Sequence, residues 1–168
     1  MKKKIVTLEE LLSIRRGLRQ EGRTLVFTNG LFDLVHAGHI RYLQQARELG
    51  DVLAIGLNSD SSASELKGPK RPILPEAERA EVLAAMESVD YIVPFSDRTA
   101  ERLVATLKPD VYVKGGDYST EGGDAGKPLP EAEIVASYGG RTVILPLVPG
   151  CSTTGILERI LERYAKPS

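Results

Sequence analysis

Short runs of consecutive apolar residues alternate along this chain with longer stretches in which apolar residues recur every three or four positions. Unbroken apolar runs are typical of parallel strands buried on both faces, and the second spacing is typical of amphipathic helices. The predicted strands are 25–27, 52–57, 91–95, 111–113 and 142–145. The predicted helices are 8–22, 39–50, 75–86, 99–108, 132–138 and 156–161.

This order of elements predicts an α/β fold. Right-handed crossovers give a Rossmann-like, doubly wound parallel sheet of five strands with helices on both faces and the first strand in the centre. Thr7 and Glu10 have the spacing of a capping box, so a helix within residues 1–22 is expected to pack on this sheet. The chain has 168 residues without internal repeats or a linker, and we expect a single domain over 1–168.

The chain's only two histidines stand where the first strand gives way to a helix. Asn29-Gly30 is expected to end the strand, and His36 and His39 lie at the start of the helical pattern. A helix N-terminus presents unpaired N–H groups and attracts phosphate, and imidazoles there can donate to phosphoryl oxygens. Gly38 would allow a ligand to approach the backbone. Capping and core packing are alternatives, whereas a zinc site is disfavoured because Cys151 is distant in sequence.

Further candidate contacts follow the later strands, since ligands of such sheets bind beyond the carboxyl ends of the strands. Asn58 and Asp60 are candidates here, with turn formation as the equal alternative. Lys67 lies in a Gly- and Pro-containing basic segment, 65–72, that is expected to be a loop over a polyphosphate or a solvated loop. Arg79 falls on the apolar stripe of its helix, so it either reaches water along the core or meets an anion.

The last third of the chain adds a glycine-rich strand exit and a hydroxyl-rich helix start. Residues 119–130 are predicted to be a loop; Gly126-Lys127 is not a phosphate loop, because Glu121 stands where that motif needs glycine. Ser152, Thr153 and Thr154 can cap the final helix or bind phosphates at its N-terminus. Thr99 is predicted to cap an earlier helix, and Cys151 is predicted to be a packing residue.

Composition narrows the class of protein. A net charge of −1 gives no basic footprint for nucleic acid, and no apolar run approaches the length of a membrane span. A single cysteine excludes an internal disulfide and fits a reducing compartment. The basic start Met1-Lys2-Lys3-Lys4 is not followed by a signal core, so we expect a cytoplasmic protein without nucleic-acid or membrane partners.

The segment Thr28-Asn29-Gly30-Leu31-Phe32-Asp33-Leu34-Val35-His36-Ala37-Gly38-His39 resembles the signature of the cytidylyltransferase-like nucleotidyltransferases. Arg79, 113–118 and 150–154 fit later segments of that family, and the resemblance runs from about Arg23 to the last helix. Class I aminoacyl-tRNA synthetases share the histidine motif, but this chain is too short for one and lacks a Lys-Met-Ser-Lys-Ser loop.

Finer matches at 57–60, 66–68, 71–72, 113–118 and 150–154 are together similar to the adenylyltransferase modules of ADP-heptose synthases. Glycerol-3-phosphate cytidylyltransferases carry an arginine shortly before the last motif, where this chain has Leu147-Val148-Pro149. This resemblance implies transfer of AMP from ATP to D-glycero-β-D-manno-heptose 1-phosphate, giving ADP-heptose and pyrophosphate. The alternatives are a cytidylyltransferase acting on a phosphorylated alcohol such as glycerol 3-phosphate, and a nucleotide-binding regulator without turnover.

The resemblance also implies roles for individual residues, a homodimer and Mg²⁺ held by the phosphates rather than by a defined set of protein ligands. His36, His39 and Lys67 would be catalytic. The ATP contacts would be Thr28, Asn29, Gly30, Phe32, Gly38, Arg79, Lys114, Ser152, Thr153 and Thr154. The contacts to the acceptor sugar phosphate would be Asp33, Asn58, Asp60 and Asp117.

Overall fold

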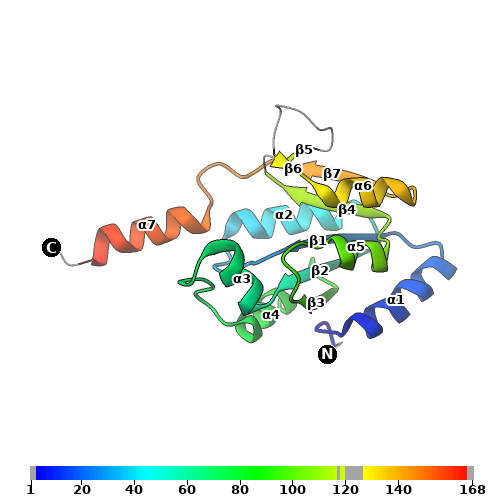
Figure 1. Cartoon of the computed structure of the whole chain (residues 1–168), viewed down its shortest axis with the longest axis horizontal. Helices are drawn as coiled ribbons and strands as arrows, with labels where there is room; N and C mark the ends of the chain where they lie inside the picture. Colours follow the sequence, from blue (N-terminus) through cyan, green and yellow to red (C-terminus); the bar gives the residue numbers. More distant parts are fainter. Residues whose placement is uncertain (1–2, 117, 120–126, 166–168) are drawn as a thin grey trace.

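Five parallel strands form the central sheet, in the order β3-β2-β1-β4-β7 (Figure 1). The computed structural model describes residues 3–116, 118–119 and 127–165. The strands of the sheet are β1 (Leu25–Gly30), β2 (Val52–Asn58), β3 (Tyr91–Phe95), β4 (Val111–Gly115) and β7 (Arg141–Leu145). The prediction of a five-stranded parallel sheet with the first strand in its centre is confirmed.

Helices cover both faces of this sheet, as the sequence predicts. They are α1 (Leu8–Gln20), α2 (Ala37–Arg47), α3 (Asp60–Lys67), α4 (Glu76–Ala84), α5 (Glu101–Leu107), α6 (Pro130–Ser137) and α7 (Thr153–Tyr164). The helices α1, α5 and α6 contribute to one hydrophobic cluster, and α2 and α4 contribute to the other. None of the helices in the described part of the chain is both long and apolar enough to cross a membrane.

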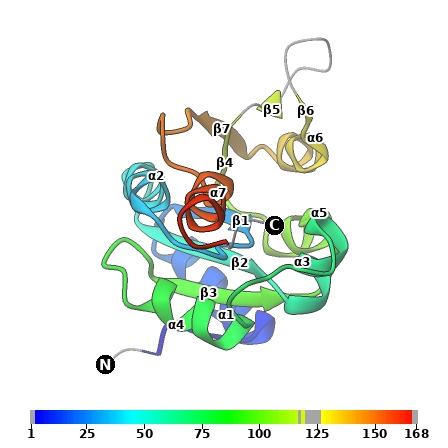
Figure 2. The same ribbon diagram turned by 90° about the vertical axis from the view of Figure 1, so that its left-hand side faces the viewer.

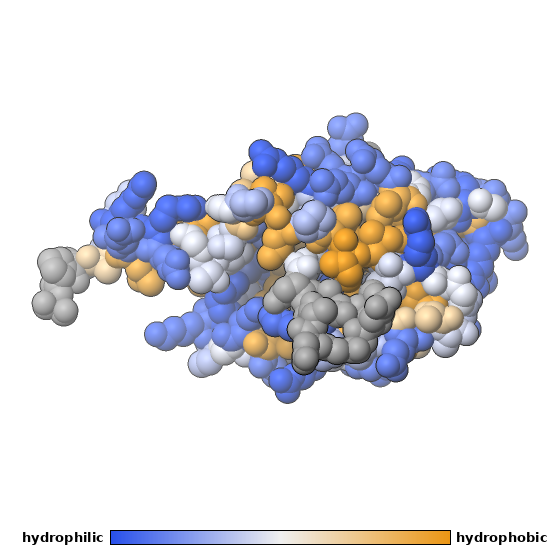
Figure 3. Space-filling view, turned by 90° about the horizontal axis from the view of Figure 1, so that it is seen from above, coloured by the Kyte–Doolittle hydropathy of each residue, from blue (hydrophilic) through white to orange (hydrophobic). Residues whose placement is uncertain are grey.

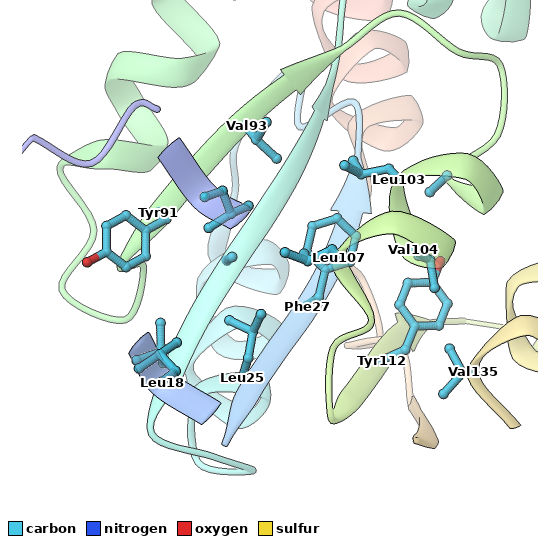
Figure 4. Close-up of a cluster of buried hydrophobic side chains, with 14 of the residues drawn as sticks. Leu18, Leu25, Phe27, Tyr91, Val93, Leu103, Val104, Leu107, Tyr112 and Val135 are labelled. Carbon is cyan, nitrogen blue, oxygen red and sulfur yellow. The ribbon is translucent and has the colours of Figure 1, made fainter. Parts of the chain in front are cut away.

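The two clusters are separated by the sheet, because successive side chains of a strand point to opposite faces. In β1, Leu25 and Phe27 belong to the cluster under α1, α5 and α6, whereas Val26 belongs to the other. Figure 4 shows the first cluster, in which the rings of Phe27 and Tyr112 stack with centroids 6.3 Å apart. Strands buried on both faces explain why their sequences lack polar alternation.

The N-terminal helix is fixed to the sheet by polar contacts as well as by packing. Thr7 and Glu10 form the predicted capping box of α1. Arg15, which is buried, donates two hydrogen bonds of 2.7 Å to the carboxylate of Asp110. Burial disfavours the charged form of Asp110, but hydrogen bonds from Arg15 and from the Leu25 N–H outweigh it, so the pKa of Asp110 is lowered.

Some predicted local features are wrong. β1 continues through Asn29-Gly30 because both residues pair with β2. Part of the predicted 65–72 loop belongs to α3, whose first turn is capped by Ser59. Thr99 does not cap α5; its hydroxyl donates to Glu101 instead. Within the predicted 119–130 loop, a short parallel pair joins β5 (Tyr118–Ser119) to β6 (Lys127–Pro128).

Candidate active site

A pocket of about 340 Å³ opens at the carboxyl ends of β1, β4 and β7. Many of the predicted site residues line it, namely Asn29, Gly30, Phe32, His36, Gly38, His39, Lys114, Ser152 and Thr153. Figure 2 views this end of the sheet, with α7 in front of β1 and α2 beside it. The pocket therefore lies where a doubly wound sheet is expected to bind its ligand.

The two histidines are held side by side by the first turn of α2. His36 is the N-cap residue, and its Nδ1 accepts a hydrogen bond of 3.1 Å from the Gly38 N–H. The Nδ1 of His39 accepts one of 3.3 Å from the His36 N–H. The rings stack with centroids 3.9 Å apart. Because each Nδ1 accepts, the proton of each neutral imidazole is on Nε2, which is left as a hydrogen-bond donor.

Both imidazoles are neutral at pH 7. Burial lowers the pKa of His36. Burial, together with the charge of His36, lowers the pKa of His39 to about 4. The ring of Phe32, 5.4 Å from that of His39 between centroids, contributes to this burial. The capping prediction and the phosphate-donor prediction are thus compatible, since Nδ1 serves the helix and Nε2 remains for a ligand.

The start of α7 packs directly against the start of α2. A Cβ atom at Gly38 would lie 2.8 Å from the Cβ of Cys151 and 2.9 Å from the His36 ring. Glycine is therefore required here for the two segments to approach. Cys151 packs against this contact, as predicted. Ser152 caps α7 by accepting a hydrogen bond from the Gly155 N–H. Two helix N-termini thus face one pocket, an arrangement that attracts anions.

The opposite side of the pocket carries an amide and a half-buried cation. The Oδ1 of Asn29 accepts a hydrogen bond of 2.6 Å from the hydroxyl of Tyr112, so the side-chain NH₂ group is directed away from that contact. Lys114 donates to the Asn29 carbonyl at 3.2 Å. Burial lowers the pKa of Lys114, and the negative charge of the buried Glu131 opposes this shift.

Asp33 is predicted to contact the acceptor sugar phosphate, but in this structure its side chain binds the segment before α4. Its side chain is 1% exposed, and it accepts hydrogen bonds from Arg71 and from the backbone N–H groups of Ile73 and Leu74. Burial opposes the charge of Asp33, but these hydrogen bonds outweigh it and lower the pKa of Asp33. Arg71 is held here too, so this part of the basic segment is fixed rather than free over the pocket.

Arg79 meets both an anion and the backbone, which confirms one of its two predicted alternatives. Its side chain is fully buried and pairs with Asp60 at 2.8 Å. It also donates to the carbonyl of Leu31, which lines the pocket, at 2.6 Å, and to those of Asn58 and Leu74. Arg79 therefore connects β2 and α4 to the loop between β1 and the histidines. All of its nitrogen atoms have protein partners, so in this structure it supports the pocket without lining it.

Other predicted contacts also lie away from the pocket. Thr28, which is expected to contact ATP, is fully buried in this structure, and its hydroxyl is 2.6 Å from that of Tyr42 on α2. Asn58 is buried and bonds to Ser62. Lys67 and Thr154 are exposed residues outside the lining of the pocket. Asp117 lies outside the described residues.

The pocket includes residues that sequence reasoning missed. They are Leu31, Tyr42, Pro146, Leu147, Val148 and Cys151, whereas Gly115 lies in the glycine-rich strand exit where ligand contacts are expected. Tyr42 follows His39 by three residues on the same helix, a spacing that places both side chains on one face. Leu147 and Val148 follow the end of β7, so the rule that ligands bind beyond strand ends could have found them. Among the described residues, no group of three His, Cys, Asp or Glu side chains could hold a metal ion.

A model of the cytidylyltransferase-like family matches residues 27–159, from β1 into α7. The chain belongs to this family. The match includes both histidines and both helix N-termini of the pocket, so the geometry described above is that of a cytidylyltransferase-like domain. The family match confirms the resemblance seen in the sequence.

Curated relatives are about 50% identical to this chain over nearly the whole of its length. The bifunctional protein HldE of Syntrophotalea carbinolica is 52% identical over 161 residues, or 96% of this chain and 32% of that protein. HldE of Geobacter metallireducens is 50% identical over 163 residues, or 97% of this chain and 32% of that protein. The chain thus spans about a third of the length of these relatives.

Solved structures support the same fold. The lipopolysaccharide core biosynthesis protein of Thermoplasma volcanium is 28% identical, with a TM-score of 0.58 over 76% of this chain and 98% of that chain. A pantoate-β-alanine ligase of Francisella tularensis is 12% identical, with a TM-score of 0.59 over 99% of this chain and 80% of that chain. The second likeness concerns the fold alone.

Proposed function

We propose that this cytidylyltransferase-like domain transfers AMP from ATP to D-glycero-β-D-manno-heptose 1-phosphate, releasing pyrophosphate and forming ADP-heptose for a lipopolysaccharide core or a related heptose glycan. Family membership supports nucleotidyl transfer. The Thermoplasma relative carries lipopolysaccharide core biosynthesis in its name, which supports the sugar pathway. The curated relatives are named bifunctional and the match covers a third of them, which fits a chain that performs one of two activities.

The pair of neutral histidines is the observation that carries the proposal. Their Nδ1 atoms are used by the backbone, and the Nε2–H groups remain for phosphoryl oxygens. Donors fixed before the reaction stabilise the charge that develops on a transferring phosphoryl group without reorganisation. A pKa of about 4 for His39 keeps this donor uncharged until the phosphates arrive.

The proposed reaction needs no general base, because the sugar phosphate is already an anion. An oxygen of heptose 1-phosphate attacks the α-phosphorus of ATP, a new P–O bond forms, and the bond between the α-phosphorus and the bridging oxygen to the β-phosphate breaks. Pyrophosphate leaves with the electron pair of that bond. His36 and His39 would hold α- and β-phosphate oxygens, and Ser152 and Thr153 would hold the triphosphate tail. Lys67 would neutralise the attacking or leaving phosphate.

The donor set of the pocket fits Mg²⁺ that arrives with ATP. Mg²⁺ prefers oxygen ligands, carboxylates among them, and retains several waters. Because no carboxylate belongs to the described lining of the pocket, the ligands of the ion would be phosphate oxygens and water. When bound, the ion would neutralise charge on the phosphates. The protein's own part is to supply neutral donors, hydroxyl groups and the Lys114 cation around it.

The choice of nucleobase is part of the proposal. Glycerol-3-phosphate cytidylyltransferases carry an arginine in the segment that corresponds to Leu147-Val148-Pro149 here. In this chain Leu147 of that segment lines the pocket. The absence of that arginine weighs against CTP as the nucleotide donor, and the apolar side chain of Leu147 offers a surface for an adenine ring. We also propose that the enzyme acts as a homodimer in the cytoplasm, where ATP is available and its single thiol stays reduced.

The test is pyrophosphate release by the purified chain with Mg²⁺ and heptose 1-phosphate, with ATP and CTP in parallel reactions. Release with ATP and not with CTP is the expected result. A matched reaction with glycerol 3-phosphate tests the acceptor. A His36→Ala, His39→Ala double variant measures background from contaminating enzymes.

Each other outcome points to a different activity. Faster release with CTP would replace the proposal by a cytidylyltransferase. Tight binding of ATP without pyrophosphate release from any acceptor would replace it by a nucleotide-binding regulator.

A further inference from the structure

The pocket opens where α7 projects from the body of the protein (Figures 1 and 3), and most of the polar groups around it are fixed as donors. The histidines present Nε2–H, Lys114 carries an ammonium group, and two helix N-termini present backbone N–H groups. Asn29 differs, because an amide has an acceptor end and a donor end of nearly the same shape. The end that faces the pocket decides whether Asn29 attracts an anion or repels one.

A buried tyrosine fixes this orientation. Tyr112 lies on β4, with its side chain fully buried in the cluster under α1, α5 and α6 (Figure 4). Its hydroxyl donates a hydrogen bond of 2.6 Å to Oδ1 of Asn29 on the neighbouring strand. The register of the sheet allows this contact, because Phe27 pairs with Tyr112 and Asn29 follows Phe27 by two residues, on the same face. The acceptor end of the amide is thus held by the core of the protein.

The donor end of the amide is left accessible. Among the residues that the structure describes, no group accepts a hydrogen bond from Nδ2 of Asn29, and the only buried side-chain nitrogen or oxygen without a partner is Nε of Arg15. Nδ2 is therefore not buried, although Asn29 as a whole is half-buried. Two further contacts hold the residue: Lys114 donates to its carbonyl at 3.2 Å, and a Cβ added at Gly56 would lie 3.2 Å from its own Cβ.

We infer that Tyr112 is a positioning residue of the active site, whose buried hydroxyl keeps the NH₂ group of Asn29 directed at the phosphates of the nucleotide. The inference rests on the proposed function, because it takes ATP as the ligand of this pocket. Tyr112 acts through Asn29, since it is fully buried and absent from the described lining of the pocket. It excludes the orientation of the amide that would set an oxygen against the phosphates, so the donor is in place before the reaction.

The test is a double-mutant cycle on Asn29 and Tyr112, measured as kcat/KM for ATP in pyrophosphate release. Tyr112→Phe is expected to lower kcat/KM about fivefold, the scale of one neutral hydrogen bond. Asn29→Ala, which loses a donor to a charged group, is expected to lower it at least about tenfold. In the Asn29→Ala background, Tyr112→Phe is expected to cause no further loss, because the hydroxyl then has no amide to orient.

Two further variants separate positioning from packing. Asn29→Asp keeps the acceptor for Tyr112 and replaces the NH₂ group by an oxygen, so it is expected to lower kcat/KM at least about a hundredfold. Tyr138→Phe is the matched control, because it also removes one tyrosine hydroxyl, which donates to the Pro109 carbonyl at 2.9 Å, at the other end of the sheet. It is expected to lose stability in urea about as much as Tyr112→Phe and to keep the wild-type kcat/KM.

Three results would overturn the inference. Equal losses from Tyr112→Phe in both backgrounds would show that the tyrosine acts through general packing, and an unchanged kcat/KM in either Tyr112→Phe or Asn29→Ala would remove the pair from the site. The same cycle is measured on the dissociation constant for ATP with Mg²⁺ and no acceptor, by isothermal titration calorimetry of the full chain. Calorimetry needs no turnover, so a non-additive cycle on binding, in a chain that releases no pyrophosphate, would contradict the proposed function alone and support the role of Tyr112.

Discussion

The two helices that begin at the pocket, α2 and α7, are anchored very differently. The segment between β1 and α2 is fixed by buried side chains. Arg79 donates to the Leu31 carbonyl, and Asp33 accepts hydrogen bonds from the backbone N–H groups before α4. The helix itself buries Gly38, Leu43 and Ala46. At the start of α7, Ser152 supplies a cap, the Thr153 hydroxyl reaches the Leu34 carbonyl at 3.5 Å, and no residue of the helix is buried.

This difference assigns different tasks to the two sides of the pocket. The histidines sit on the anchored side, where donors must already be in place if they are to stabilise a transition state. The hydroxyl groups of α7 lie on the weakly anchored side. The free energy of local opening is small there, so the helix start can move when a triphosphate enters or leaves. We expect changes on the α2 side to affect global stability and the chemical step, and changes on the α7 side to act locally.

The largest effect is expected from Arg79→Leu. Removing this side chain leaves the buried carbonyl of Asn58 and the part-buried carbonyls of Leu31 and Leu74 without this donor, and each buried group left unsatisfied costs about 1–3 kcal/mol of unfolding free energy. Asp60, which is 50% exposed, loses its ion-pair partner but keeps its hydrogen bond from the Glu76 N–H. Urea unfolding measures the loss. Arg102→Leu is the control, because its pair with Asp97 is exposed and is expected to contribute about 1 kcal/mol or less. Equal losses in the two variants would mean that Arg79 does not anchor the loop.

His39→Ala tests the anchored side at the chemical step. Loss of one fixed donor is expected to lower kcat about 10²–10³-fold. Steady-state pyrophosphate release measures the rate, and circular dichroism confirms that the variant is folded. Ile40→Ala, at the exposed neighbouring position on α2, is the control and should retain its rate. A folded His39→Ala enzyme with a near-normal rate would remove this histidine from the mechanism.

Lys67→Ala tests whether a residue that lies outside the lining of the pocket takes part in the reaction. Lys67 is exposed at the end of α3, so the variant is expected to keep its melting temperature. If Lys67 reaches a phosphate during the reaction, activity falls about tenfold or more, the scale of a hydrogen bond to a charged group. Lys70→Ala, an exposed lysine of the same segment, is the control. A loss of stability along with activity would favour a structural role for Lys67.

Sequence reasoning recovered what is encoded locally. The capping box of α1 lies within four residues, and each buried strand is an unbroken apolar run, so the parallel sheet with its first strand in the centre followed from pattern and handedness. It missed α3 because that helix buries Ser62 and Ala63 rather than an apolar stripe. Ser59, whose side chain accepts a hydrogen bond from the Ser62 N–H, was the available signal.

The anchoring of the loop before α2 was out of reach for a different reason. Asp33 and Arg71 are 38 residues apart in sequence, and Arg79 and Leu31 are 48 apart. A charged residue near a motif has the same appearance in sequence whether it faces a ligand or a buried partner. Asp33, Asn58, Asp60 and Arg79 were therefore assigned to ligands, although the fold gives each of them a partner within the protein.

The pH dependence of stability also separates the two sides, because both titrating histidines belong to α2. The unfolded state takes up a proton at His39 near pH 6.5, and the folded state resists until about pH 4. The free energy of unfolding should therefore fall as pH drops from 6.5 towards 4, by less than about 1.4 kcal/mol per pH unit for this one group. Asp33 and Asp110, whose pKa values are lowered, add losses that begin as pH approaches their unfolded pKa of about 3.8 and continue below it.

Urea unfolding at successive pH values measures this slope. His39→Gln, which cannot titrate, should reduce the slope between pH 6.5 and 4, leaving the part due to His36, and should leave the decline near pH 3.8 and below in place. An unchanged slope would show that His39 is not buried in its neutral form.

The smallest global effect is expected from Ser152→Ala. The variant loses the hydroxyl that accepts from the Gly155 N–H, and loss of such a cap costs about 1 kcal/mol of helix stability. Because α7 buries no residue, the cost should appear as faster amide hydrogen exchange within α7, while exchange in α2 and the midpoint of global unfolding stay unchanged. Ser137→Ala, whose hydroxyl bonds within the exposed end of α6, is the control and should leave α7 unaffected. A drop in global stability equal to the loss in α7 would mean that this helix unfolds together with the sheet, and the contrast between the two sides of the pocket would no longer hold.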